Sequence, residues 1–232
     1  MVQIRYVLYF TGITLLTLLL TQMEVLAPGS LRLLVYADIG DTVGTSEYSP
    51  VEMIQVVILF ACGALHLWAA IQCRSQRPVA IFFGGLAAIF LVRELDYFLD
   101  QIVDNLWQVI MAVLSALLIA YTYRHRRRFS IAWMRVWPSP GIVLLFAGAV
   151  ILFVFARLIG HDTLWKAILG DTYQRVIPLT VEELTEIVGY CFWFIGSVEY
   201  VYQARAIAMR EPQPAAVKRR VGRRRKKSSG HY

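Results

Sequence analysis

Residues 51–73 read VEMIQVVILFACGALHLWAAIQC, an apolar stretch whose only acidic or basic side chains are Glu52 and His66. A helix needs about 20 predominantly apolar residues to cross a hydrocarbon core about 30 Å thick. Because this stretch has that length and composition, and Arg74 follows it at once, it predicts a transmembrane helix.

Five further stretches share this character, so we expect an all-α, polytopic membrane bundle of six transmembrane helices. Of the 232 residues, 58% are hydrophobic and 17% are charged, which excludes a disordered chain, a disulfide scaffold and a conventional soluble enzyme. Prolines lie just outside most of the stretches and favour helix ends there. We interpret the first stretch as a retained signal anchor. The predicted spans are 6–27, 51–73, 79–99, 106–123, 141–160 and 181–204.

The distribution of charge predicts which side of the membrane each terminus faces. With the N-terminus inside, 18 of the 23 Lys and Arg residues fall on inner segments and 14 of the 16 Asp and Glu residues fall on the outer side. Cytoplasmic segments of membrane proteins are enriched in Lys and Arg. We therefore expect both termini to be cytoplasmic. The short loops and the strong arginine asymmetry favour a bacterial inner membrane.

Three connections between the predicted spans have compositions suited to a membrane surface. Residues 129–137 interleave aromatic and basic side chains and predict a short helix or turn at the inner headgroup level. Residues 161–175 include Trp165 and are expected to rest on the outer surface. Residues 29–49, rich in Gly, Asp, Thr and Ser, form the longest polar connection.

The chain divides into a transmembrane bundle over residues 1–205 and a disordered, basic cytoplasmic tail over residues 206–232, which is too polar to fold alone. Anionic lipid headgroups attract such a tail by about 1 kcal/mol per basic residue. The alternatives are a solvated tail that only fixes topology, or a contact with nucleic acid, which the lack of interleaved aromatic residues disfavours. The lipid-binding candidates are Lys218, Arg219, Arg220, Arg223, Arg224, Arg225, Lys226 and Lys227.

Ionisable residues inside the predicted spans form an outer polar layer. Such residues are costly in lipid and usually face the interior of a helical bundle. Glu94 and Glu186 each lie about five residues inside the outer end of a span, which at 1.5 Å per residue puts both roughly 7–8 Å below the interface. Glu182 lies four residues before Glu186 and shares its helix face. The candidate residues are Arg93, Glu94, Asp96, Arg157, Glu182, Glu183 and Glu186.

This layer predicts a carboxylate-lined vestibule that opens outward, with arginine side chains that balance part of its negative charge. Its carboxylates would suit a divalent cation, the passage of protons, or acid–base chemistry on a bound substrate. Alternatively, salt bridges among the same residues would lock the helices together. Glu182 and Glu183 would also stabilise the N-terminus of their own helix.

His66 and Glu199 form a second candidate pair near the inner ends of their spans. Their similar depth predicts a hydrogen bond across the bundle, and a proton relay uses such a pair. The alternative is that His66 is a packing residue with satisfied hydrogen bonds, while Glu199 reaches the inner interface.

Small residues predict close helix packing in two of the spans. Gly141 and Gly148 are seven residues apart, and so are Gly189 and Gly196. Glycine lets helix backbones approach each other in lipid. We therefore expect the sixth span to lie at the centre of the bundle.

The chain lacks the motifs of the common catalytic and metal sites. It has no P-loop, no nucleotide-binding glycine pattern after a strand, no GxSxG and no HExxH. Cys62, Cys73 and Cys191 form no CxxC pair and are expected to pack as small apolar residues. A divalent cation in the outer layer is therefore the one cofactor that the sequence suggests.

Three functions are compatible with the sequence. A non-catalytic accessory or sensory subunit, docked to a membrane-protein partner through its basic tail, agrees best with the small soluble mass and the absence of catalytic motifs. A small transporter or proton- or cation-coupled carrier would use Glu94 and Glu186, although no internal repeat of the kind common in transporters is visible. A membrane-embedded enzyme acting on a lipid or lipid-linked substrate would use Glu94, Asp96 and Glu186.

Overall fold

The computed structural model describes residues 2–27, 30 and 50–210, and within these ranges every regular element is a helix. This confirms the expected all-α fold class. The elements are α1 (Val2–Leu26), α2 (Pro50–Gln72), α3 (Arg77–Glu94), α4 (Asp96–Asp100), α5 (Leu106–Arg124), α6 (Arg126–Val136), α7 (Pro140–Val150), the π-helical turn η1 (Ile151–Phe155), α8 (Ala156–Ile159), α9 (Asp162–Leu169), the 3₁₀ turn η2 (Gly170–Thr172) and α10 (Val176–Arg210).

Four helical segments of the described chain are long and apolar enough to cross a membrane. They are Ile4–Leu26 within α1, Pro50–Gln72, Leu106–Arg124, and Pro140–Ile159, which combines α7, η1 and α8. They coincide with four of the six predicted spans. The helices at the other two, α3 and α10, are less apolar, because both carry several charged side chains.

The helices at the third and sixth predicted spans have ends that differ from the span boundaries. α3 ends at Glu94, and the separate helix α4 begins after Leu95. α10 begins at Val176 and contains Pro178 in its first turn, where proline forfeits no helical hydrogen bond. At its other end α10 continues to Arg210, so the predicted tail begins inside a helix. The tail beyond residue 210, with its eight candidate lipid-binding residues, lies outside the described residues.

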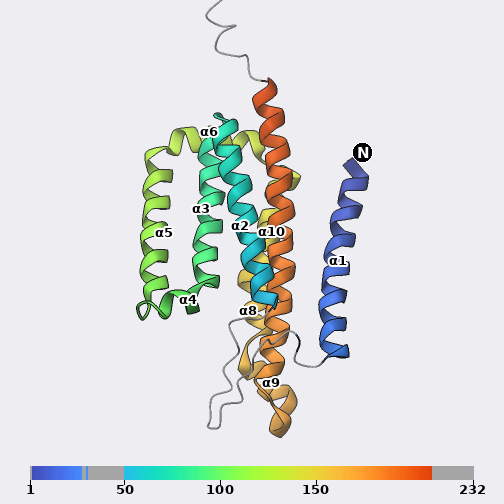
Figure 1. Cartoon of the computed structure of the whole chain (residues 1–232). Coiled ribbons are helices and arrows are strands. Elements are labelled where there is room, and N and C mark those ends of the chain that lie inside the picture. The colour runs from blue at the N-terminus through green and yellow to red at the C-terminus, as the bar shows by residue number, and fades with distance from the viewer. Residues whose placement is uncertain (1, 28–29, 31–49, 211–232) are drawn as a thin grey trace, which may run out of the picture.

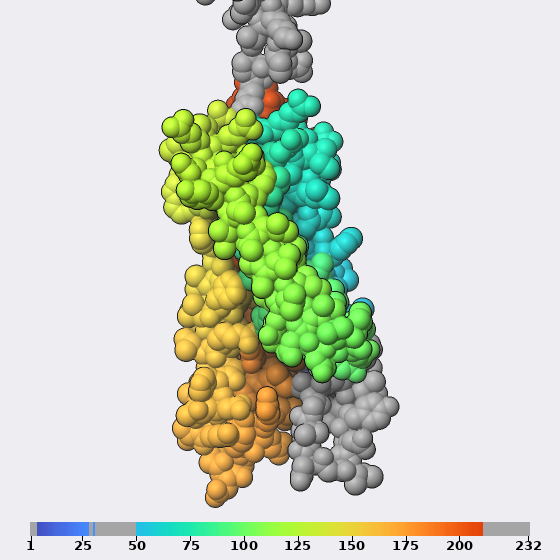
Figure 2. All heavy atoms as spheres, turned by 90° about the vertical axis from the view of Figure 1, so that its left-hand side faces the viewer, coloured from blue at the N-terminus to red at the C-terminus, as the bar shows by residue number. Residues whose placement is uncertain are grey.

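The helices α2, α3 and α10 lie side by side in the middle of the molecule (Figure 1). α5 packs on α3 on one side, and α1 stands on the far side of α10. The view in Figure 2 shows α5 crossing its face of the molecule obliquely. The N-terminal end of α1, the C-terminal end of α10 and α6 gather at one end of the molecule, whereas α4 and α9 lie toward the other (Figure 1).

The closest packing in the core is between α7 and α10. A Cβ atom added to Gly148 would lie 2.7 Å from the carbonyl oxygen of Gly189, so the two backbones are in contact there. Gly196 approaches the Leu145 backbone nitrogen just as closely, with an added Cβ atom 2.8 Å away. The expectation that these glycines allow close helix approach is confirmed. It also accounts for the central position of α10, which packs on α1, α2 and α7.

Short helices occupy two of the predicted connections. Residues 129–136 belong to α6, which buries Ala132 and Val136 and leaves Arg127 and Arg128 exposed. The connection at 161–175 contains α9, where the Trp165 indole donates a hydrogen bond to the Ile159 carbonyl at 2.5 Å. Apart from Ser30, the polar connection 29–49 lies outside the described residues.

Candidate functional site

Five of the predicted outer-layer residues meet where α3 and α8 end against the first half of α10. Arg93 is the penultimate residue of α3, and Arg157 follows the π-helical turn. A π-helical turn is a wider helical turn that often occurs at functional sites. We call Arg93, Glu94, Arg157, Glu182 and Glu186, together with Tyr190 of α10, the outer cluster.

Glu186 is the centre of the outer cluster. Its side chain is buried, and its Oε1 atom accepts a hydrogen bond from Arg93 Nη2 at 3.3 Å. The same oxygen accepts a hydrogen bond from Arg157 Nη2. Two guanidinium groups from two different helices therefore neutralise one buried carboxylate of a third helix.

Arg157 also binds Glu182, one turn before Glu186 on α10. Its Nη1 atom lies 2.5 Å from Glu182 Oε1. The carboxylate of Glu182 approaches Gly160, where an added Cβ atom would collide with it. Glycine at position 160 thus provides the space that Glu182 occupies.

Glu94 is held by a hydrogen bond from Tyr190, and the arginine beside it is beyond hydrogen-bond distance. The Tyr190 hydroxyl donates to Glu94 Oε1 at 2.6 Å, and Arg93 Nη1 lies 3.9 Å from the same oxygen. Both Tyr190 and Glu94 have little exposed surface. The predicted layer did not include Tyr190. Its position four residues after Glu186, on the same helix face, is the sequence signal that would have identified it.

Asp96 and Glu183 lie at the margin of the outer cluster. Asp96 is the first residue of α4, and its carboxylate accepts a hydrogen bond from the backbone N–H of Tyr97 at 2.7 Å. Glu183 lies next to Glu182 on α10 and is half-buried. In residues 2–27, 30 and 50–210, no group of three or more His, Cys, Asp or Glu side chains is placed to hold a metal ion.

The predicted inner pair is wrong, because the structure gives His66 and Glu199 different partners. The His66 Nε2 atom lies 3.0 Å from the Ser197 hydroxyl of α10, and the ring stacks on Phe83 with centroids 5.6 Å apart. Glu199 is two residues beyond Ser197. Successive helix positions are rotated by about 100°, so Ser197 and Glu199 face different neighbours.

Glu199 instead joins α10 to α1. Arg5 Nη2 donates to Glu199 Oε2 at 3.2 Å, the Tyr6 hydroxyl donates to the same oxygen at 3.2 Å, and the Tyr9 hydroxyl donates to Oε1 at 3.0 Å. Sequence reasoning missed these partners. The signal was available, since Arg5, Tyr6 and Tyr9 lie within about one helical turn at the expected depth of Glu199.

Comparison with known proteins adds no family to this description. No protein-family model matches the chain, and neither does any curated protein or any solved structure.

Proposed function

We propose that the chain is a six-span membrane protein with both termini on the cytoplasmic side of a bacterial inner membrane. The side-by-side packing of α3 and α10 against the apolar helix α2 supports counting them as spans. The arrangement of the first and last described helices supports an even number of crossings, since the start of α1 and the end of α10 lie at the same end of the molecule (Figure 1).

In this proposal the chain is a non-catalytic accessory or sensory subunit. The outer cluster is then a structural lock, meaning a set of ion pairs that holds the helices together. The single observation that carries it is the double pairing of Glu186 with Arg93 and Arg157. Both guanidinium groups bind the same carboxylate oxygen, so two positive charges already balance the charge of Glu186. A buried charge whose partner is removed is strongly destabilising, so such a cluster ties α3, α8 and α10 together.

A double-mutant cycle tests the lock. Arg157→Met leaves Glu182 without its arginine and Glu186 with Arg93 alone, and Glu186→Leu leaves Arg157 with Glu182 alone. The double variant removes both partners of one pair. We expect each single variant to lose about 2 kcal/mol of unfolding free energy, and the double variant to lose less than the sum by at least about 1 kcal/mol. SDS titration in mixed micelles measures the four proteins, with Asp104→Asn as an exposed acidic control. Additive losses would contradict the lock.

The accessory role is tested through the basic tail. Full-length protein purified from its native membranes is expected to retain a membrane-protein partner in fixed stoichiometry, and deletion of residues 211–232 is expected to release it. A deletion that leaves every partner attached would contradict the docking role.

A second candidate, a proton- or cation-coupled carrier, is favoured by one observation. The hydrogen bond of 2.6 Å between Tyr190 and Glu94 puts a second buried carboxylate beside the Arg93–Glu186 pair. A carrier built on these residues predicts proton or cation flux into proteoliposomes that Glu186→Gln abolishes and Asp104→Asn leaves unchanged. Flux no greater than in protein-free vesicles would contradict it.

A further inference from the structure

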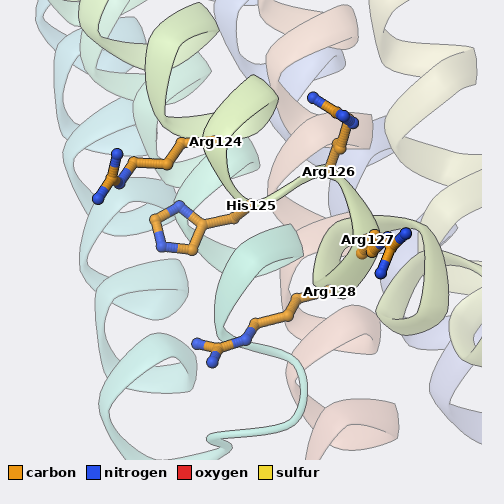
Figure 3. Close-up of a pocket in the computed structure, with 5 residues that line it drawn as sticks. All are labelled: Arg124, His125, Arg126, Arg127 and Arg128. Carbon is orange, nitrogen blue, oxygen red and sulfur yellow. The ribbon is translucent and has the colours of Figure 1, made fainter.

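Five consecutive basic residues surround the turn between α5 and α6. Arg124, His125, Arg126, Arg127 and Arg128 line a hollow of about 470 Å³. Figure 3 shows Arg124, His125 and Arg128 extending to the same side of this turn. The hollow therefore brings the positive charges of Arg124 and Arg128 to one side of the junction between two helices.

These charges are not balanced by the rest of the described chain. The four arginines are exposed, and none of them forms an ion pair with an Asp or Glu among residues 2–27, 30 and 50–210. The guanidinium group of Arg126 lies over the Tyr123 ring, 4.8 Å from its centroid. Because the like charges that line one hollow repel one another, an anion bound between them would stabilise the turn.

An apolar groove of about 580 Å³ runs between α2, α3 and α5 next to this hollow. Gly63 leaves open space on the wall of α2, while Leu117 and Leu118 line the wall of α5. The groove is open to the surroundings, since Leu117 is 61% exposed. It is thus an apolar surface of the size and shape that suits a hydrocarbon chain.

The groove and the hollow are contiguous. Tyr121 lines the groove and His125 lines the hollow, and their rings lie 4.4 Å apart between centroids. The His125 Nδ1 atom also lies 3.0 Å from the Tyr121 carbonyl oxygen. A basic hollow directly joined to an apolar groove matches a ligand with an anionic head and an apolar chain.

We propose that the hollow and the groove together bind one anionic phospholipid of the inner leaflet. The phosphate diester lies between Arg124 and Arg128, which form charge-assisted hydrogen bonds with its oxygens. One acyl chain lies in the groove between α2, α3 and α5. This inference rests on the proposed topology, in which α6 lies at the inner headgroup level.

A spin-labelled lipid tests the site. The full-length protein is reconstituted into phosphatidylcholine vesicles that contain a trace of either phosphatidylglycerol or phosphatidylcholine labelled on the acyl chain. The electron paramagnetic resonance spectrum then reports the fraction of label immobilised by the protein. A basic residue near a membrane surface contributes about 1 kcal/mol, so for the two arginines we expect an association constant about thirtyfold higher for phosphatidylglycerol.

Two pairs of variants separate the proposed site from the overall charge of the protein. Arg124→Gln combined with Arg128→Gln is expected to reduce the preference for phosphatidylglycerol to about twofold. Arg205→Gln combined with Arg210→Gln removes the same charge from exposed positions on α10, at the same end of the molecule, and is expected to keep the preference. Equal losses in the two double variants would overturn the site, because the selectivity would then come from net charge.

A third pair of variants tests the groove. An added Cβ atom at Gly63 meets no atom within 4 Å, so Gly63→Leu fills the groove without a backbone clash. Gly12→Leu is the matched control, because position 12 of α1 is equally open and lies outside the groove. We expect only Gly63→Leu to lower the immobilised fraction of phosphatidylglycerol, and an unchanged fraction would overturn the acyl-chain position.

The same spectra distinguish failure of the site from failure of the proposed topology. Equal immobilisation of the two lipids by the unaltered protein would overturn the lipid site and leave the membrane bundle in place. Immobilisation of neither lipid would overturn the membrane bundle as well.

Discussion

Glu199 of α10 and Arg5 of α1 form an ion pair, with Oε1 and Nε 3.2 Å apart, across 194 residues of sequence. Tyr6 and Tyr9 donate hydrogen bonds to the same carboxylate. Three residues from the first turns of α1 therefore converge on one buried side chain. This relationship determines where the first helix attaches to the rest of the bundle.

Removal of the Glu199 carboxylate should loosen α1. Glu199→Ala leaves Arg5 and two tyrosine hydroxyls without their acceptor, and because Arg5 is about one-third exposed we expect a loss of about 1–2 kcal/mol of unfolding free energy. Glu199→Gln keeps an amide oxygen that accepts hydrogen bonds from the tyrosines, and it should lose less. SDS titration in mixed micelles measures both variants. A Glu199→Ala variant as stable as the unaltered protein would show that the carboxylate does not hold α1.

The proposed topology predicts opposite accessibility for two exposed basic residues. In a variant with Cys62, Cys73 and Cys191 replaced by alanine, Lys166→Cys on α9 is expected to react with a membrane-impermeant maleimide added to intact cells. Arg127→Cys on α6 should react only after the membrane is made permeable. Because α6 and α9 lie toward opposite ends of the molecule, the same pattern at both positions would contradict the topology (Figure 1).

The contact between α7 and α10 should not tolerate a side chain at position 148. A Cβ atom there would lie 2.7 Å from a backbone carbonyl oxygen of α10, which moves only if the whole helix moves. We expect Gly148→Leu to lose about 3 kcal/mol or more of unfolding free energy, at or above the upper end for overpacked cores. Gly12→Leu, at a position with no atom within 4 Å of an added Cβ, should lose much less in the same SDS titration.

The Ser197 hydroxyl should matter because it is the hydrogen-bond partner of the fully buried His66. Ser197→Ala leaves the His66 Nε2 atom unsatisfied, which costs about 1–3 kcal/mol for a buried polar group. Ser130→Ala on the exposed face of α6 is the control and should stay close to the unaltered protein. A thermal unfolding scan in detergent compares the two, and equal midpoints would contradict a structural role for this hydrogen bond.

The helices themselves were predictable because apolar runs of sufficient length leave few other structures open to the chain. The predicted helix ends were less accurate where charged residues or proline lie at the edge of a long apolar run. At Leu95 the sequence alone gives no reason for α3 to stop, since Asp96–Asp100 is itself helical, and only the change of direction separates α3 from α4. Likewise, the start of α10 at Val176 depends on tolerance of Pro178 in a first turn, which a boundary rule for proline does not anticipate.

The candidate site was predicted in part. Depth along a helix follows from counting residues, which predicted a common level for Arg93, Glu94, Arg157, Glu182 and Glu186, and the structure brings these five side chains together. Depth does not determine which way a side chain faces. The pairing of His66 with Glu199 failed for that reason, although the two residues were placed at a similar level.

The sequence by itself determined that this chain is helical and that four of its described segments are long and apolar enough to cross a membrane. These properties are local, because they depend on composition and on the rise of a helix per residue. Only the tertiary structure decided the partners: Arg93 and Arg157 for Glu186, Ser197 for His66, and Arg5 for Glu199. Partners depend on the rotation of each helix about its axis, and contacts from several helices at once set that rotation.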